Sequence, residues 1–455
     1  MQTQKDHVAA HQFMTGRMVS ALVSGDLNRT EIPARRGRHG VIMGIVLAVL
    51  AAAGFAVYGL VVPGGNTAYQ QAGAILVEKE TGTRYVFTGG QLRPTLNEAS
   101  ALLFEGQNGK IDLISQNSLK GLPHGAPIGI VGAPDPVPTP ADLLTGPWLM
   151  CLPSANTSDT AIMDVDLAGS TPTSAVGANQ YVVVTAATGQ EFVVWHGAKY
   201  QVTDSAAPVA LGFANVQSLP APSAWLDALR NGGALAAATI TGAGQQGPQI
   251  AGQTYPIGQL FTEGVGNGTQ QSFVLGRTGL QPVSATEFAL LAAQSGAAAP
   301  VPISASTVAS AQVSADDSLL HAVPDLIGAT ALNSGAQPIC VRQQGAGTSG
   351  TSVVVAQKAF PSASNGSSVN VSMTTGHGML VTTPAAAQAA ALGGSTGPEF
   401  LINDQGIKFL IPDSASTEAL GFGNVKPVPM STELLAEIPS GPTLSRAAAA
   451  ATQEG

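Results

Sequence analysis

The chain has 455 residues, with 28 Asp or Glu against 19 Lys or Arg and a formal net charge of −9. Its 54 Gly and 30 Pro favour short strands and many turns over long helices. Nucleic-acid binding is not expected, because phosphate neutralisation needs clustered Lys and Arg that an acidic chain of low charge content lacks.

The first predicted element is a helix over residues 4–24, QKDHVAAHQFMTGRMVSALVS, in which Met14, Met18 and Leu22 recur at spacings of four. Such spacing is typical of one apolar face of a helix. An isolated helix of this length is marginal in water, so we expect it to dock on a partner protein or on the inner face of a bilayer. The expected docking residues are Phe13, Met14, Met18 and Leu22. The alternative is a tail that is helical only in part.

The next element is a run of 22 uncharged residues, 41–62. As a helix it extends roughly 33 Å, enough to cross a hydrocarbon core of about 30 Å. Three arginines lie within residues 35–38 and no basic residue follows until Lys79, so we expect residues 1–40 in the cytoplasm and 63–455 outside it. A cleaved signal peptide is disfavoured, because signal peptides have a shorter apolar core and only a short basic segment before it. Here 40 residues precede the apolar run.

Four stretches beyond the span share one pattern, an aromatic-led apolar strand, a turn closing on Gly and a second strand. Their strands begin at Tyr85, Phe192, Phe273 and Phe400, and their turns contain Gly90, Gly197, Gly279 and Gly406. Glycine supplies the positive φ that tight turns require. Each stretch is therefore predicted to be a β-hairpin.

A second pattern follows the hairpins, a Pro-punctuated extended stretch, a Ser or Thr, and a short helix. It is clearest from Leu211, LGFANVQSLPAPSAWLDAL, and from Leu420, LGFGNVKPVPMSTELLAEI, with a looser version from Ile128. In the third copy residues 280–284 run directly into an expected helix over 285–291, so that copy looks abbreviated. Ser or Thr before a helix is common N-cap chemistry.

These patterns predict an α+β fold, with a single N-terminal transmembrane helix followed by an elongated domain of four hairpin-plus-helix repeats around a central, mainly-β core. The uneven intervals between the copies disfavour a regular solenoid or propeller. The expected repeats cover about 75–147, 180–233, 255–296 and 398–440, and the expected core covers about 148–179 and 301–391.

The only two cysteines, Cys151 and Cys340, fall one in each expected core segment. Outside the cytoplasm such a pair more often forms a disulfide than two free thiols. Closing a loop of roughly 190 residues is worth about 5 kcal/mol in the chain-entropy picture. The surrounding segments are rich in Gly, Ser and Thr, so we expect little apolar surface there. Two buried, reduced cysteines are the alternative.

Three motifs resemble catalytic signatures but lie in the wrong context. Gly242–Gly247 and Gly345–Gly350 fit the dinucleotide fingerprint, which requires a helix to follow, whereas Pro248 follows the first and a strand-like TSVVV the second. Ser395 in GGSTG fits a nucleophile elbow, but a helix precedes it and a strand follows, the reverse of the required order. No P-loop, H-E-x-x-H or C-x-x-C sequence occurs. We therefore predict no catalytic, cofactor-binding or metal-ligating residue.

Two acidic pairs carry no basic or histidine partner nearby in the sequence. They are Asp164 with Asp166 and Asp316 with Asp317. We interpret both as solvated turns.

Several features in this order resemble the EccB family. They are a Gln12-Phe13 helix, one early span, LRPTLNEASALL from Leu92, GIVGAP from Gly129 and GPWLMC ending at Cys151. EccB proteins are the single-span membrane component of the actinobacterial type VII (ESX) secretion system. The resemblance covers essentially the whole chain.

The resemblance implies an inner-membrane location, a short cytoplasmic segment and a periplasmic domain of four repeats around a disulfide-bearing core. It implies assembly with the EccC motor ATPase, EccD and EccE, and self-association of the periplasmic domains above the membrane pore. Some members are described as ATPases, which makes ATP the one cofactor candidate. Because phosphate-binding signatures are lacking, we expect a structural component rather than an enzyme. The alternatives are a periplasmic ATP or cell-wall hydrolase and a cell-wall-binding module.

Overall fold

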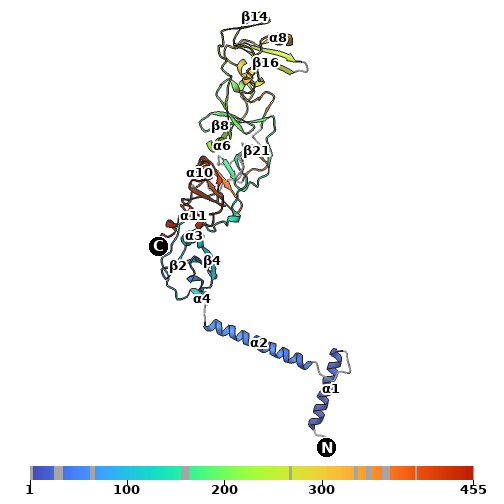
Figure 1. Cartoon of the computed structure of the whole chain (residues 1–455), viewed down its shortest axis with the longest axis vertical. Coiled ribbons are helices and arrows are strands. Elements are labelled where there is room, and N and C mark those ends of the chain that lie inside the picture. The colour runs from blue at the N-terminus through green and yellow to red at the C-terminus, as the bar shows by residue number, and fades with distance from the viewer. Residues whose placement is uncertain are drawn as a thin grey trace. The chain divides into compact units, whose positions relative to one another are not determined.

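The computed structural model describes nine stretches of the chain, residues 4–24, 34–61, 67–154, 163–265, 269–332, 337–344, 350–360, 369–394 and 397–453. They form two packing units, residues 1–92 with 111–124 and residues 93–110 with 125–455. Figure 1 shows the elements of both units, coloured along the chain.

Two helices open the first unit, α1 (Gln4–Ser24) and α2 (Ala34–Val61). The predicted helix over residues 4–24 is confirmed. Within α2, His39–Gly59 has a mean hydropathy of 2.5 and is long and apolar enough to cross a membrane. α2 begins seven residues before the predicted span because arginine is a good helix former and Pro33, which disfavours helix at the residue before it, stands just ahead of it.

The first sheet has the strand order β3-β2-β1-β4. Its elements are η1 (Ala68–Gln70), β1 (Ala74–Glu78), β2 (Arg84–Thr88), β3 (Gln91–Pro94) and β4 (Lys110–Ile114), followed by α4 (Gln116–Leu119). Leu76, Leu92 and Ile114 are fully buried at its centre. The turn from β2 to β3 places Gly90 at a φ of 77°, a conformation that favours glycine.

Three further sheets repeat this order. The second contains β8 (Gln180–Ala186), β9 (Glu191–Trp195), β10 (Ala198–Val202) and β11 (Leu219–Ala221), extended by β12 (Arg230–Leu235) and β19 (Thr330–Ala331). The third contains β15 (Leu260–Val265), β16 (Thr269–Gly276), β17 (Gly279–Val283) and β18 (Val301–Ile303), and the fourth β23 (Gly378–Thr382), β24 (Glu399–Asn403), β25 (Lys408–Ile411) and β26 (Val428–Pro429). In each, three antiparallel strands are joined by a fourth strand parallel to the first. The four predicted hairpins are confirmed.

Each of these four sheets is accompanied by two helices at equivalent points in the sequence. One lies between the third and fourth strands, α3 (Glu98–Glu105), α5 (Ala207–Ala210), α7 (Ala285–Ala292) and α11 (Ser414–Ala419). The other follows the fourth strand, α4, α6 (Ser223–Asp227), α8 (Ala305–Ser310) and α12 (Thr432–Glu437).

Two second halves differ from the sequence interpretation. In the first sheet the fourth strand and its helix are β4 and α4, whereas the stretch from Ile128 contains only the short helix η3 (Pro140–Asp142). The third sheet is not abbreviated, because β18 and α8 follow α7. The reason is that the third copy contains two Ser-capped helices, after Ser284 and after Ser304, so the cap alone does not tell which of the two helices follows.

A six-stranded sheet joins the chain's centre to a later segment, in the order β22-β6-β5-β20-β21-β7. Its strands are β5 (Trp148–Leu152), β6 (Met163–Asp166), β7 (Thr173–Ala175), β20 (Ile339–Gln343), β21 (Thr351–Ala356) and β22 (Val369–Ser372). Of the expected core segment 301–391, only the strands between residues 339 and 372 belong to this sheet, because β18 and β23 pair with strands of the third and fourth sheets. The mixed α/β architecture with several small sheets agrees with the predicted class.

The predicted disulfide is present. Cys151 of β5 lies directly opposite Cys340 of β20, with an S–S distance of 2.02 Å and 3.9 Å between Cα atoms. Both cysteines are fully buried. The expectation of little apolar surface was wrong, because all five residues of Trp148–Leu152 are buried although the segment's overall composition is polar.

The remaining elements close the second unit. They are β13 (Gln246–Ile250), β14 (Gln253–Pro256), η2 (Gly106–Asn108), α9 (Ser318–His321), α10 (Pro384–Ala391) and α13 (Arg446–Ala449). The Ala-rich tail packs on α3, where Arg446 Nε donates a hydrogen bond to the Leu103 carbonyl at 3.3 Å. Thr452 then forms an isolated antiparallel bridge with Ile128, which holds this segment against the stretch that begins at Ile128.

We predict that replacing both Cys151 and Cys340 with Ala lowers stability by about 2–5 kcal/mol, the usual loss for a native disulfide. The Ser pair should lose about 1–3 kcal/mol more, because it buries two hydroxyls in the same apolar site. Thermal unfolding of the full chain in detergent measures both. An Ala pair that unfolds at the wild-type temperature contradicts the prediction.

Candidate interaction surfaces and buried sites

The predicted docking residues all lie on α1, and all are exposed, with relative residue exposures between 59% and 81%. At about 100° per residue, Met14, Met18 and Leu22 form one stripe, which we call the α1 stripe. Phe13 lies about 140° around the helix from Met18, on the other side. The helix therefore brings three of the four predicted residues together and separates Phe13 from them.

α2 is exposed along its whole candidate span. Valine, leucine and isoleucine side chains cover every side of it, including Ile42, Leu47 and Val57. A helix that is apolar all round and not covered by protein is suited to lipid rather than to water.

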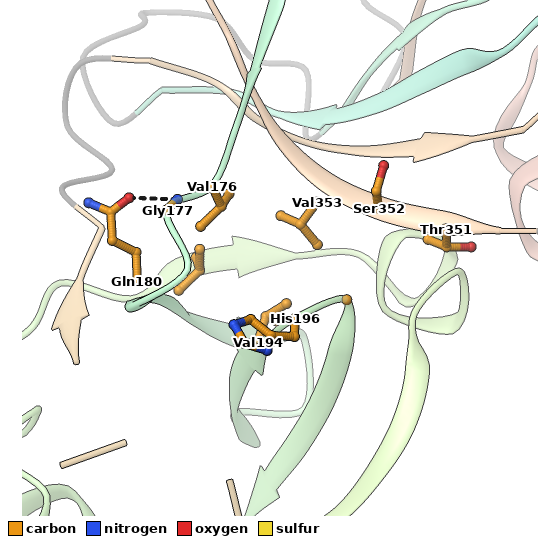
Figure 2. A pocket seen from close by; sticks show the side chains of 10 residues that line it. Val176, Gly177, Gln180, Val194, His196, Thr351, Ser352 and Val353 are labelled. Atoms are coloured by element: carbon orange, nitrogen blue, oxygen red, sulfur yellow. Dashed lines mark hydrogen bonds between the residues drawn. The ribbon is translucent and has the colours of Figure 1, made fainter. Parts of the chain in front are cut away.

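A small cavity lies at the junction of two sheets in the second unit, where β21 of the six-stranded sheet faces β8 and β9 of the second sheet (Figure 2). Its volume is about 180 Å³, and ligand pockets usually exceed about 300 Å³. The lining residues are Val176, Gly177, Gln180, Val182, Val194, His196, Gly197, Thr351, Ser352 and Val353.

His196 is the only titratable residue in this lining. It has a positive φ of 47°, stacks on Trp195 with 4.3 Å between ring centroids, and its Nε2 lies 2.8 Å from the Ala178 carbonyl oxygen. Because that nitrogen is held by a backbone carbonyl and no carboxylate lines the cavity, the site lacks an acid and base pair. The cavity therefore has the features of a small gap between two packed sheets.

The residues of the catalytic-like motifs do not lie in the structural context that those motifs require, where the structure describes them. Gly242 and Gly244 lie in turns with φ of 88° and 80°, and β13 rather than a helix follows them. Residues 345–349 and Ser395 lie outside the described residues. Among the described residues no group of three His, Cys, Asp or Glu side chains could hold a metal ion.

The two acidic pairs have different environments. Asp316 and Asp317 are exposed, as predicted, and hydrogen bonds from Ser318 lower the pKa of Asp316. Asp164 and Asp166 are buried in β6, so their interpretation as a solvated turn was wrong. Asp166 accepts hydrogen bonds from the Thr171 hydroxyl at 2.6 Å and the Gly169 amide at 3.1 Å, which explains why a strand-end carboxylate is tolerated there.

Two buried glutamates were not predicted from the sequence. Burial raises the pKa of Glu287 on α7 and of Glu399 on β24, and hydrogen bonds from Ala238 N and the Thr417 hydroxyl partly offset this. Glu287 Oε1 accepts from Ala238 N at 2.7 Å, whereas its buried Oε2 has no partner among the described residues. The glutamates belong to different sheets, so they do not form a catalytic pair. Glu287 is the third residue after Ser284, a spacing that predicts only a helix cap.

The described residues therefore define a mixed α/β protein with one helix long and apolar enough to cross a membrane, several small mixed sheets and a buried disulfide. The family profile described as Type VII secretion system ESX-1, transport TM domain B, matches residues 1–455. The chain therefore belongs to the EccB family of type VII secretion, as its sequence features predicted.

Known relatives match over different shares of their length. The ESX-3 secretion system ATPase EccB3 of Mycolicibacterium smegmatis is 26% identical over 474 residues, which cover 97% of this chain and 89% of that protein. EccB1 of the ESX-1 system of Mycobacterium tuberculosis is 31% identical over 149 residues, 33% of this chain and 30% of that protein. The match to EccB5 of Mycobacterium marinum, 29% identical, covers 32% of this chain and only 28% of that protein.

Solved structures share the fold. The structure of an intact ESX-5 inner membrane complex contains a chain with a TM-score of 0.66 and 24% identity, covering 100% of this chain and 96% of that one. The EccB3 dimer from the ESX-3 core complex gives a TM-score of 0.63 at 24% identity, covering 83% and 100%.

We predict that Glu287→Gln stabilises the chain near neutral pH, because the amide keeps the hydrogen bond from Ala238 N but carries no charge that must be buried. Because folding raises this pKa, stability is fully present below about pH 4.5 and falls as the pH rises through the raised value. The Glu287→Gln variant should not show this decrease of stability with rising pH. Melting temperature against pH measures it, with exposed Glu433→Gln as control. An equally steep fall in the variant contradicts the prediction.

Proposed function

We propose that this chain is a structural component of the ESX inner membrane complex and that its domains outside the cytoplasm assemble above the membrane pore. The observation that carries the proposal is the match of the EccB family profile to residues 1–455. The fold agrees with it, since a related chain in the intact ESX-5 inner membrane complex aligns over 100% of this chain.

We propose that α2 crosses the inner membrane once, with residues 1–40 in the cytoplasm, 41–62 as the span and 63–455 in the periplasm. Support comes from the arginines of residues 35–38 on one side only and from the exposed apolar surface of α2. The disulfide fits an oxidising compartment.

We propose that the four equivalent sheets are four repeats, with strands and helices over about 74–119, 180–227, 260–310 and 378–437, and that the six-stranded sheet is a core against which the second and fourth repeats pack. Helices at equivalent points meet in pairs within the second unit, α3 with α11, α5 with α7 and α6 with α12. Such nearest-neighbour packing is how small repeats gain stability, because one repeat alone buries too little surface.

The proposed partners are the EccC, EccD and EccE components and further copies of this chain. The α1 stripe is the proposed cytoplasmic docking surface, because it leaves Met14, Met18 and Leu22 exposed on a helix that is marginal alone. Self-association is supported by the solved relative, which is a dimer of EccB3.

Two other functions have weaker support. The curated relatives are named ATPases, but the sequence has no P-loop and Gly242–Gly247 leads into β13 rather than into a helix. A cell-wall-binding module would need an aromatic-lined groove, and the chain has only three Trp and six Tyr. Trp225, the most buried of the tryptophans, is part of the core.

We predict that Met14→Asp with Met18→Asp leaves the chain folded but reduces co-purification of the other membrane components. Each carboxylate would enter a packed contact, which costs several kcal/mol unless it is paired. The measurement is the amount of each component recovered with a tagged full-length chain.

The matched control is Ala9→Asp with Phe13→Asp, which adds the same two charges at the same spacing on the opposite side of α1. This pair should keep the complex intact. A complex that survives the Met14 and Met18 changes, or fails equally with the control pair, contradicts docking by the α1 stripe.

A further inference from the structure

A groove of about 620 Å³ lies beside the third sheet, within the second unit. Ligand pockets usually have volumes of about 300–1,000 Å³, so this groove is large enough for a small ligand. Three segments line it, residues 239–241, the turn from β16 to β17 at residues 276–278, and the loop of residues 312–316. We call it the third-sheet groove.

Two of these segments are fixed to each other by backbone hydrogen bonds. Leu280 N donates to the Gln312 carbonyl oxygen at 2.8 Å, and Ser314 N donates to the Leu280 carbonyl oxygen at 2.7 Å. At Gly279, which has a φ of 129°, a Cβ atom would overlap the Gln312 carbonyl oxygen. Close backbone contact therefore sets the shape of this part of the groove before any ligand binds, which lowers the cost of binding.

The third segment is positioned by a buried carboxylate. Ala238, just before residues 239–241, donates its N–H to Oε1 of the fully buried Glu287 at 2.7 Å. Gly242, just after them, lies against Arg277, because a Cβ atom there would come within 2.8 Å of Arg277 Nε. The glycine at 242 therefore leaves room for the arginine side chain at the edge of the groove.

The groove contains two opposite charges that do not pair with each other. Arg277 is exposed and is the only Lys or Arg between Arg230 and Arg342. No hydrogen bond or ion pair joins its guanidinium group to another described residue. Asp316 also lines the groove, and its Oδ1 accepts a hydrogen bond from Ser318 N at 2.9 Å. The groove thus offers a cation and an anion at separate points.

The uncharged lining is suited to peptide groups. Hydroxyls of Thr241, Thr278 and Ser314 and the amide of Gln281 line the groove, and such groups both donate and accept hydrogen bonds, as a peptide bond does. A ligand with several negative charges, such as a nucleotide, is disfavoured, because one arginine faces a loop that carries Asp316 and the exposed Asp317.

We propose that the third-sheet groove binds a short peptide by its two charged ends, the carboxylate at Arg277 and the ammonium group at Asp316. A guanidinium group pairs with a carboxylate through two parallel hydrogen bonds, which makes arginine suited to this role. The proposal goes beyond assembly of the membrane complex, because it assigns a ligand to one sheet and does not depend on the partners of the chain.

The first test is a calorimetric titration of the full-length chain in detergent with trialanine, whose small side chains leave the two ends to decide the affinity. Trialanine should bind measurably. Trialanine amide lacks the carboxylate and N-acetyl-trialanine lacks the ammonium group, so each should bind several-fold more weakly. Inorganic phosphate should bind more weakly than trialanine, because it has no positive group for Asp316.

Two variants assign the ends of the peptide. Arg277→Gln should weaken trialanine binding several-fold but leave the affinity for trialanine amide unchanged. Asp316→Asn keeps an oxygen for Ser318 N and should weaken trialanine binding but leave the affinity for N-acetyl-trialanine unchanged. Lys426→Gln removes an exposed cation just before β26 and should change none of these affinities.

Three results would overturn the proposal. They are the absence of trialanine binding, equal binding by the wild-type chain and both groove variants, and phosphate binding as tight as that of trialanine, which would indicate a simple anion site. Hydrogen exchange with trialanine present adds a check of position. Residues 276–281 and 312–316 should exchange more slowly, and protection confined to other residues would place the peptide elsewhere.

Discussion

The second unit depends on one apolar cluster that no single sheet could form alone. Small repeated units gain stability from the interfaces that they form with their neighbours. Here the six-stranded sheet contributes Met150 and Val341, the second sheet Val184 and the fourth sheet Val381 to one continuous core. Sheets that are far apart in the sequence are stabilised by burying these side chains against one another.

Two helices complete this cluster. Trp225 of α6 is fully buried, and its Nε1 donates a hydrogen bond to the Met150 carbonyl oxygen at 3.1 Å, so the ring is both packed and satisfied. Leu434 of α12 is equally buried. Full burial of one such side chain is worth about 1.5–3 kcal/mol. The Cys151–Cys340 bond lies in the same six-stranded sheet and adds a covalent link between strands 189 residues apart.

Local features were predictable from the sequence, and long-range pairing was not. The helix of residues 4–24 and the four hairpins follow from apolar spacing and from glycine turns such as Gly279. The pairing of β5 with β20 depends on contacts across 189 residues, which no local pattern encodes. Glu287 was not predicted as a buried residue, because the segment that covers it, at Ala238, is distant in the sequence. Asp166 was interpreted as part of a solvated turn, because the sequence does not show that the following turn, with Thr171, folds back onto its carboxylate.

The two N-terminal helices leave apolar side chains exposed. α2 presents an apolar surface on all sides and α1 presents a stripe on one side. We propose that the surface of α2 meets lipid and that the α1 stripe meets a partner protein. A component that holds a machine together needs such surfaces more than it needs a reactive site.

The most direct test of this account is the mass and composition of the particle released from the membrane by a mild detergent through a tag on this chain. The account predicts a large particle that contains several copies of the chain together with EccC, EccD and EccE in fixed proportion. Release of the chain as a monomer free of these components, under conditions in which they remain assembled with each other, would contradict it.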